Sequence, residues 1–281
     1  MSRPHTVFVQ AQEIPWATGL YGTGRSDVGI KELSRDADSG ASTTIIRYPA
    51  GWRRDGAHHL TVHEEFLVLE GSIEINGRTY SPYCYANLPA GYARQMAKSA
   101  DGAVVLTMLS GEPHTKDGAA APGLLDPKLL VEHIDCAGKG LEGWTENPYT
   151  RYLMGTGVQP LREDPYTGEI TILYAALPFR YMEKQWSHPT VQEMYLLAGE
   201  YVINDVGILR PGAYCWWREN LFHGPYGSRT GFMFLIRTDG GKLANIIKDE
   251  IIPVDYDAPH RPSLPDELRP YDAELPPIKN Y

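Results

Sequence analysis

The fold of this chain is decided by a stretch that occurs twice, as EEFLVLEG in Glu64–Gly71 and as QEMYLLAG in Gln192–Gly199. The two copies lie 128 residues apart, and the same spacing joins matching residues elsewhere in the two halves. At that spacing the matching pairs include Trp16 with Trp144, Gly29 with Gly157, Leu33 with Leu161 and Gly40 with Gly168. After one inserted residue the spacing becomes 129, which matches Pro82 with Pro211 and Tyr85 with Tyr214. A register held through so many positions indicates a duplicated domain.

The length of the chain fits this duplication. Its 281 residues correspond to one or two domains of ordinary size. We expect an N-terminal domain over residues 1–135, a C-terminal domain over 136–251 and an extended proline-rich tail over 252–281. The tail is rich in proline and acidic residues, which is typical of a solvated arm. Its tyrosines and leucines leave open an arm that wraps the other copy or a second subunit.

Charge and hydropathy argue against two classes of partner. The formal net charge is −9 and no basic run opposes it, so neither nucleic acid nor an anionic membrane is expected as the main partner. No apolar run approaches the ~20 residues of a membrane span, and the N-terminus lacks the apolar core of a signal peptide. The sequence therefore predicts a cytoplasmic protein whose partner is a small-molecule substrate.

Short strand-like runs bounded by glycine, proline or Asn-Gly dominate the pattern. The expected strands are Ser42–Tyr48, Glu65–Leu69, Ser72–Ile75, Ala103–Leu109, Glu169–Ala176, Glu193–Leu197 and Gly231–Ile236. Asn76-Gly77 predicts a tight hairpin after one of them. One helix is expected, over Pro127–Ile134 between the repeats. Without helices for crossovers, the strands favour an antiparallel double sheet whose inner face is filled or holds a ligand.

Two motifs resemble those of the cupin superfamily. The first runs from PAG (Pro49–Gly51) through the histidine pair His58–His59 to EEFLVLEG, and copy two gives SHPTVQEMYLLAG (Ser187–Gly199). Copy two also has the Pro-Gly turn of the second cupin motif, Pro211–Gly212, followed by the late histidine His223. The chain resembles a bicupin, most like the anti-sigma-factor and acetylacetone-cleaving-enzyme type of cupin.

The resemblance implies an all-β fold of two tandem cupin barrels, each a jelly roll or double-stranded β-helix, with an extended C-terminal tail. The motifs are specific for the fold. They say little about the reaction, because this fold hosts many chemistries.

The second copy carries metal-ligand residues at positions that the resemblance implies, namely His188, Glu193 and His223. Two imidazoles and one carboxylate on one face leave coordination positions open, as in non-haem Fe(II) oxygenases, and they also suit Zn, Mn or Ni. We therefore expect one divalent metal ion, with Fe(II) favoured. Gln192 is interpreted as a neighbour of the ligand Glu193. Many cupins have a further histidine where this chain has Trp186.

Tyr195 is the candidate catalytic residue. On an extended strand it shares a face with Glu193. From there it would donate a hydrogen bond or a proton to an oxyanion of the substrate at the metal.

The first copy has lost two of the three ligand positions. Leu60 stands in place of His188 and has no donor atom, and Arg94 stands near the place of His223 and would repel a metal ion. We expect a structural or dimerisation barrel in which Arg94 pairs with Glu65. The alternative is a rewired second metal site, with the candidate ligands His58, His59, His63 and Glu65.

These residues favour a metal-dependent enzyme with its site in the second copy. The favoured reaction is that of a non-haem iron dioxygenase that cleaves a C–C bond of a small diketone-like or phenolic substrate. A Zn- or Mn-dependent isomerase, lyase or hydrolase is a second hypothesis. A non-catalytic bicupin that binds a small molecule is a third. A homodimer is expected, because symmetric dimers are the commonest closed assemblies.

Overall fold

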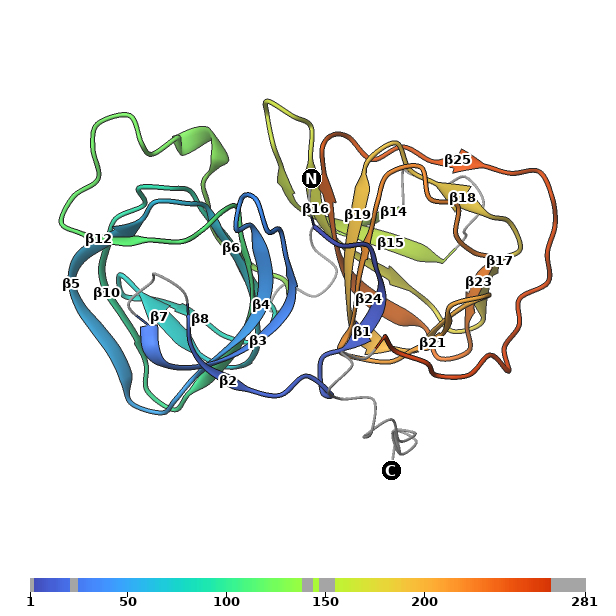
Figure 1. The fold of residues 1–281 in the computed structure, drawn as a ribbon, viewed down its shortest axis with the longest axis horizontal. Helices are drawn as coiled ribbons and strands as arrows, with labels where there is room; N and C mark the ends of the chain where they lie inside the picture. Colours follow the sequence, from blue (N-terminus) through green and yellow to red (C-terminus); the bar gives the residue numbers. More distant parts are fainter. Residues whose placement is uncertain (1–2, 21–24, 138–143, 147–154, 264–281) are drawn as a thin grey trace. The chain divides into compact units, whose positions relative to one another are not determined.

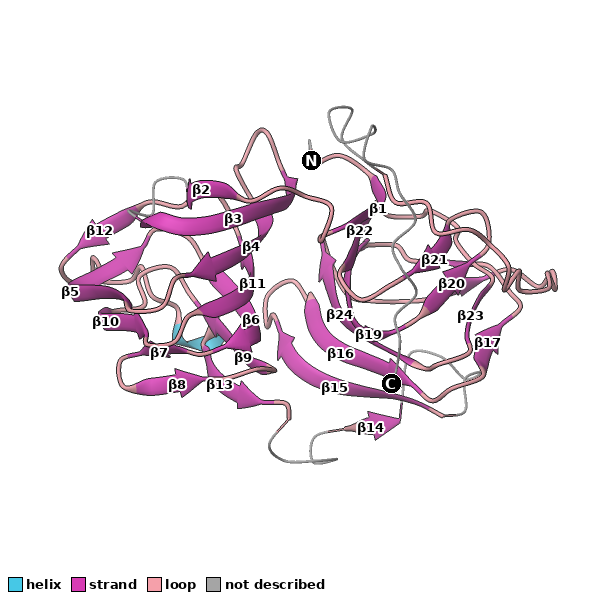
Figure 2. Cartoon of the chain, turned by 90° about the horizontal axis from the view of Figure 1, so that it is seen from below, coloured by secondary structure: helices cyan, strands magenta, loops and turns pink. Residues whose placement is uncertain are grey.

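The computed structural model describes residues 3–20, 25–137, 144–146 and 155–263. Antiparallel strands joined by turns make up nearly all of it (Figure 1). Figure 2 shows one short helical turn among the strands, the 3-10 turn Pro127–Leu129. The all-β fold of jelly-roll cupin barrels expected from the sequence is confirmed.

The chain divides into two compact units. The first unit comprises residues 1–4, 15–144 and 159–172, and the second comprises 5–14, 145–158 and 173–281. Each unit therefore takes a short segment from the part of the sequence that otherwise builds the other unit.

Two sheets enclose the core of the first unit. In hydrogen-bonded order, the larger sheet consists of β13 (Val131–Asp135), β9 (Cys84–Leu88), β6 (Glu64–Gly71), β11 (Ala103–Leu109), β4 (Ser42–Tyr48), β3 (Arg25–Arg35) and β2 (Ala17–Leu20). The smaller sheet consists of β12 (Thr115–Asp117), β5 (Trp52–Leu60), β10 (Arg94–Ser99), β7 (Ile73–Ile75) and β8 (Arg78–Tyr80). Phe66 and Val68 belong to the buried cluster between the sheets, together with Trp52 and Ile75. Because alternate residues of a strand share a face, Glu64 on β6 points into the same space.

The second unit repeats this plan. Its larger sheet consists of β1 (Thr6–Gln10), β22 (Ala213–Trp217), β19 (Val191–Gly199), β24 (Phe232–Asp239), β16 (Ile170–Ala176), β15 (Thr156–Glu163) and β14 (Thr145–Glu146). Residues 159–163 of β15 and 170–172 of β16 belong to the first unit. A four-stranded sheet consists of β17 (Arg180–Met182), β23 (Tyr226–Ser228), β20 (Tyr201–Ile203) and β21 (Gly207–Leu209), and a small ribbon pairs β18 (Trp186–Ser187) with β25 (Ile246–Ile247). The rings of Tyr201, Tyr226 and Phe234 pack together inside.

The strand at the start of each copy completes a barrel in a matching way. In the second unit β1 pairs with β22 (Figure 2). The amide of Ala11 donates to the carbonyl of Gly212 at 3.0 Å. In the first unit β13 pairs with β9, and the amide of Cys136 donates to the carbonyl of Tyr83 at 3.2 Å. Gly212 and Tyr83 are 129 residues apart, so these two bonds occupy the same place in the repeat. The opening strand of copy one thus belongs to the second unit, and that of copy two to the first.

The expected hairpin at Asn76–Gly77 is confirmed. Both residues have positive φ, 54° and 80°, as a type I′ turn requires, and the turn joins β7 to β8. The expected helix over Pro127–Ile134 is wrong. Only the 3-10 turn Pro127–Leu129 forms, and Val131–Asp135 continues as strand β13 because its backbone pairs with β9.

The described part of the C-terminal tail lies along the second unit. The carbonyl of Pro259 accepts the Ile208 amide at 3.0 Å, and Ala258 is buried. The Ser263 amide donates to the carbonyl of Phe8 at 2.7 Å. Residues 264–281 of the predicted tail and residues 138–143 lie outside the described residues.

No helix in the described ranges combines the length and the apolar character that a bilayer crossing demands.

Candidate metal site in the second unit

Two histidines lie beside each other inside the second unit. His188 lies between β18 and β19, and His223 lies in the loop between β22 and β23. Their ring centroids are 5.2 Å apart. The backbones of His223 and Trp186 exchange two hydrogen bonds of 2.9 and 3.0 Å, which hold the loop against β18. The His223 ring packs against Trp217, with centroids 4.5 Å apart.

Backbone carbonyls fix the orientation of both rings. Nδ1 of His188 donates to the carbonyl of Ala244 at 2.9 Å, and Nδ1 of His223 donates to that of Leu221 at 3.1 Å. Because a carbonyl only accepts, Nδ1 carries the proton and Nε2 of each neutral ring keeps its lone pair. Burial lowers the pKa of both histidines, that of His223 to about 3. Nε2 of His188 is buried and meets no hydrogen-bond geometry with the described residues, although the side chain of Asn245 interacts with the ring and acts to raise its pKa.

The arrangement of the rings fits two ligands of one metal ion. With a metal–nitrogen bond of about 2.1 Å, two imidazoles at a tetrahedral angle have centroids about 5 Å apart, close to the observed 5.2 Å. Metal-binding histidines also usually donate their other ring nitrogen to a carbonyl or carboxylate.

Gln192 offers a third donor atom. It lies on β19 directly opposite Trp217 of β22, and the Trp217 ring touches His223. Its Oε1 is buried and has no hydrogen-bond partner within the described part of the chain. An unsatisfied buried carbonyl costs about 1–3 kcal/mol, and a metal ion would satisfy it. Gln192 is therefore the candidate third donor, an amide oxygen, beside the two neutral imidazoles.

The structure does not bring Glu193 to the two histidines. Adjacent strand residues point to opposite faces, so Glu193 faces away from Gln192. Its carboxylate accepts the Tyr214 hydroxyl at 2.7 Å and forms an ion pair with Arg237. Across the described residues, no three His, Cys, Asp or Glu side chains converge as a metal site. The predicted set of His188, Glu193 and His223 is thus wrong in its carboxylate.

Tyr195 shares the outer face with Glu193, and its placement inside the barrel is also wrong. It pairs with Tyr214 on β22 and with Leu235 on β24, on the side away from Gln192. Burial raises its pKa well above the usual range. A phenol placed there cannot reach a substrate at the histidines.

In the first unit, a buried ion cluster occupies the matching place. Both Glu64 oxygens accept from Arg25, at 2.7 and 3.2 Å, and Oε2 also accepts from Arg94 at 2.7 Å. Burial alone would raise the pKa of Glu64, but the charges of the two arginines outweigh it and lower the pKa to about 2. The expected pairing of Arg94 with Glu65 is therefore wrong, because Arg94 points inward to Glu64.

The alternative second metal site is not assembled either. Nδ1 of His58 bonds to the Gly56 carbonyl at 2.9 Å, and Nδ1 of His59 bonds to the Gly118 carbonyl at 3.2 Å. The third candidate, His63, uses the nitrogen as an acceptor: its Nδ1 accepts a hydrogen bond from the Ala90 amide at 3.1 Å.

Glu65, the fourth candidate of that site, has partners of its own within the first unit. Its carboxylate accepts the hydroxyls of Tyr85, at 2.7 Å, and Thr171. Each of the four side chains is thus held by a different partner.

The repeat register shows how the two interiors differ. The spacing of 128 aligns Trp186 with His58, His188 with Leu60 and Gln192 with Glu64, and the spacing of 129 aligns His223 with Arg94. The first unit keeps one histidine and the carboxylate, whereas the second keeps the other two histidines. Only the second therefore has two imidazoles side by side.

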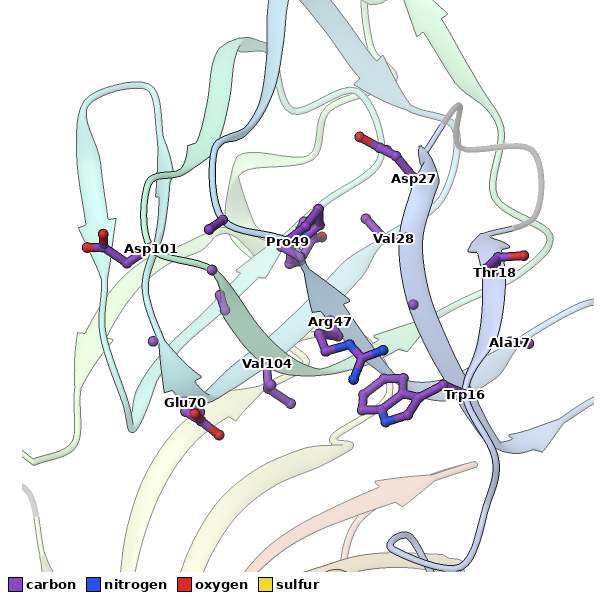
Figure 3. Close-up of a pocket in the computed structure, with 16 residues that line it drawn as sticks. Trp16, Ala17, Thr18, Asp27, Val28, Arg47, Pro49, Glu70, Asp101 and Val104 are labelled. Carbon is purple, nitrogen blue, oxygen red and sulfur yellow. The ribbon is translucent and has the colours of Figure 1, made fainter.

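A second pocket, of about 600 Å³, lies on the first unit, and Tyr48 lines both this pocket and the small interior cavity. Figure 3 shows Arg47 over the indole of Trp16, 4.3 Å from the ring centroid, with Asp27, Glu70 and Asp101 around the rim. The arginine already covers one face of the indole. No histidine or cysteine is among the described residues that line the pocket.

Comparison with known proteins gives one family and a set of similar structures. A family model described as a domain of unknown function, DUF4437, matches residues 6–245. A comparison with curated proteins gives no match.

Among solved structures, a candidate dioxygenase from Nostoc punctiforme is 20% identical, with a TM-score of 0.76 over 90% of this chain and 92% of that one. A mutant of Bacillus subtilis oxalate decarboxylase is 12% identical, with a TM-score of 0.53 over 86% of this chain and 79% of that one. A second oxalate decarboxylase structure, from work on its Mn(II) centres, is 13% identical with the same TM-score and coverage. At these identities the likeness to the solved structures shows the fold alone.

Proposed function

The chain belongs to the DUF4437 family, a domain family of unknown function, and we propose that its second unit binds one divalent metal ion through His188, Gln192 and His223. The observation that carries the proposal is the buried Nε2 of His188 beside the His223 ring. We further propose that the protein is a metal-dependent enzyme, with a non-haem iron dioxygenase as the favoured type. The similarity to a candidate dioxygenase supports this choice of reaction.

The metal would supply Lewis acidity and, as Fe(II), reactivity toward dioxygen. The chain's own part is to hold and shield the site. The carbonyls of Ala244 and Leu221 keep both imidazoles in the tautomer that presents Nε2. The rings of Trp186 and Trp217 pack against the histidines, and Tyr226 packs against Trp186, while His223 stays partly exposed.

The neutral donor set narrows the substrate class. Two imidazoles and an amide leave the full charge of a divalent ion unbalanced by the protein. A small substrate that binds as an anion through two adjacent oxygens balances that charge, as the enolate of a diketone or a deprotonated phenol does. The aromatic walls suit the apolar body of such a molecule.

Metal content tests the site directly. Elemental analysis of protein expressed in iron- and zinc-replete medium should give one ion per chain, and His188→Ala and His223→Ala should each lose most of it. Gln192→Glu should retain the ion more tightly, roughly 10–100-fold in affinity, because a carboxylate is a stronger donor for a divalent ion than an amide.

Glu193→Gln is the matched control for Gln192→Glu. It changes the charge of the adjacent residue on the opposite face and keeps an acceptor for Tyr214. Its metal content should equal that of the wild type. A full complement of metal in His223→Ala would disprove the site.

Oxygen consumption then separates the reactions. A dioxygenase consumes one dioxygen per substrate and stops under nitrogen, whereas a Zn- or Mn-dependent isomerase, lyase or hydrolase runs anaerobically at full rate. A non-catalytic role would give ligand binding that a chelator does not change, without turnover.

A further inference from the structure

The interior of the first unit contains more positive than negative charge. Arg94 is 1% exposed and Arg25 is 7% exposed, and guanidinium groups stay protonated in proteins. Glu64 is the acidic residue among those that line the small cavity beside them. The neutral imidazole of His58, whose pKa is lowered by burial, adds no negative charge. Among the residues that line this cavity, two cations thus face one anion, and an excess of buried positive charge is costly without a counter-ion.

One nitrogen at this cavity lacks an acceptor. Arg94 donates through its terminal nitrogens to Glu64 at 2.7 Å and to the Tyr92 carbonyl at 3.3 Å. Its Nε is buried and has no hydrogen-bond partner within the described ranges. The missing partner of an N–H group is an acceptor, so the site calls for an oxygen atom or an anion and not for a cation.

The size of the cavity selects the occupant. Its volume is about 20 Å³, and about 10–15 Å³ suffices for one water-sized body. Sulfate, phosphate and carboxylic acids are too large. Chloride is only slightly larger than water and accepts hydrogen bonds from arginine.

The nearest exposed carboxylate does not balance the charge. Asp27 accepts the Trp52 indole N–H at 3.2 Å and is exposed to water, which screens its charge. Asp27 does not line the small cavity, whereas Trp52 does. We propose that the first unit binds one chloride ion between Arg94, Arg25 and His58, as the counter-ion of the Arg25–Glu64–Arg94 cluster.

Thermal unfolding in different salts measures this binding. At equal ionic strength, a chloride concentration tenfold above its Kd should raise the Tm of the first unit's transition by roughly 3–6 °C relative to gluconate. Arg94→Met removes the excess charge and leaves the Arg25–Glu64 pair, so it should abolish the difference between the salts. Arg53→Met, which removes an exposed arginine paired with Asp55, should keep it.

Crystals grown in sodium bromide decide the question without any variant. An anomalous bromide peak within hydrogen-bond distance of Arg94 Nε is the expected result. A cavity that shows only a water-sized peak without anomalous signal, with equal Tm in chloride and gluconate, would overturn the proposal.

Discussion

The interiors of the two units differ at one matching strand position, which is Glu64 on β6 and Gln192 on β19. Glu64 and Gln192 point inward, whereas Glu65 and Glu193 point outward to Tyr85 and Tyr214. The sequence alone could not show which of two adjacent residues faces the barrel, because both faces of this sheet are covered and all four side chains are buried. The resemblance implied Glu193 as the metal ligand and left Gln192 as its neighbour. The repeat register aligns Gln192 with Glu64, so it shows that these two residues occupy matching positions. It does not show that both side chains point into the barrel. Arg25 was missed because a lone arginine on a strand gives no pairing signal.

Removal of the buried carboxylate should be far more damaging than removal of one arginine. Glu64→Gln leaves Arg25 and Arg94 buried without a counter-charge and should cost about 3–5 kcal/mol of unfolding free energy. Arg94→Met leaves a neutral pair, so it should cost less. Denaturant unfolding measures both, and Glu74→Gln, at a half-exposed pair with Lys98, should change stability by less than about 0.5 kcal/mol.

The lowered pKa of Glu64 predicts how the stability of the first unit changes as the pH falls. Its pKa is lowered from 4.5 to about 2 in the folded protein. A lowered pKa stabilises the fold fully above the unfolded value, and that contribution is lost as pH falls through the folded value. The stability difference between wild type and Glu64→Gln should therefore be constant above about pH 5 and shrink between about pH 4.5 and 2. A difference that does not depend on pH over this interval would contradict the ion cluster.

At the scale of elements, the local pattern predicted strands well, but apart from the hairpin at Asn76–Gly77 it did not predict which strands pair. Ser42–Tyr48 and Ala103–Leu109 agree with β4 and β11 residue for residue. The wrong helix prediction has a physical cause. The apolar residues of PKLLVEHI have helical spacing, but the backbone of Val131–Asp135 pairs with the edge of β9 instead. Tertiary pairing overrides local propensity in such a segment.

Two matched glycines test the repeat at this scale. Gly71 and Gly199 have φ of 67° and 78°, and a Cβ at either would collide with a carbonyl oxygen, that of Gly102 or Gly231. Gly71→Ala and Gly199→Ala should each cost more than about 2 kcal/mol, since the collision adds to the conformational cost. Gly77 has a φ of 80°, and no atom lies within 4 Å of the place that a Cβ would occupy. Gly77→Ala should therefore lower the free energy of unfolding by only about 1–2 kcal/mol, because an alanine must adopt the left-handed conformation there. Equal losses at all three positions would contradict the collision.

At the scale of the whole molecule, the opening strands of the two copies exchange barrels. Sequence similarity could not reveal this, because β1 and β22 are separated by about 200 residues of chain. Phe8 on β1 is fully buried, and the carbonyl of Val7 accepts the Trp217 indole N–H at 2.8 Å. The second unit therefore depends on the N-terminus for part of its core.

The expected homodimer stays a prediction, which native mass measurement checks.

Loss of the N-terminal strand should harm the second unit selectively. Phe8→Ala should cost about 3–5 kcal/mol, as for other fully buried aromatic residues. A variant in which a glycine-serine linker of equal length replaces residues 5–14, so that Arg3 keeps its bonds to Ser34 and Thr43 of the first unit, should lose hydrogen-exchange protection at β22 amides and release its metal, while amides of β9 stay protected. Equal loss of protection in both strands would mean that the dependence is not confined to the second unit.

The exchange of opening strands also bears on how such a gene arose. A single ancestral copy would have an open edge beside its second motif and a leading strand that fits only the same edge of another copy. Two such chains would complete each other as an intertwined pair, and joining their genes would turn that partnership into one polypeptide. Separately expressed halves of the present chain should therefore associate with each other far better than either folds alone.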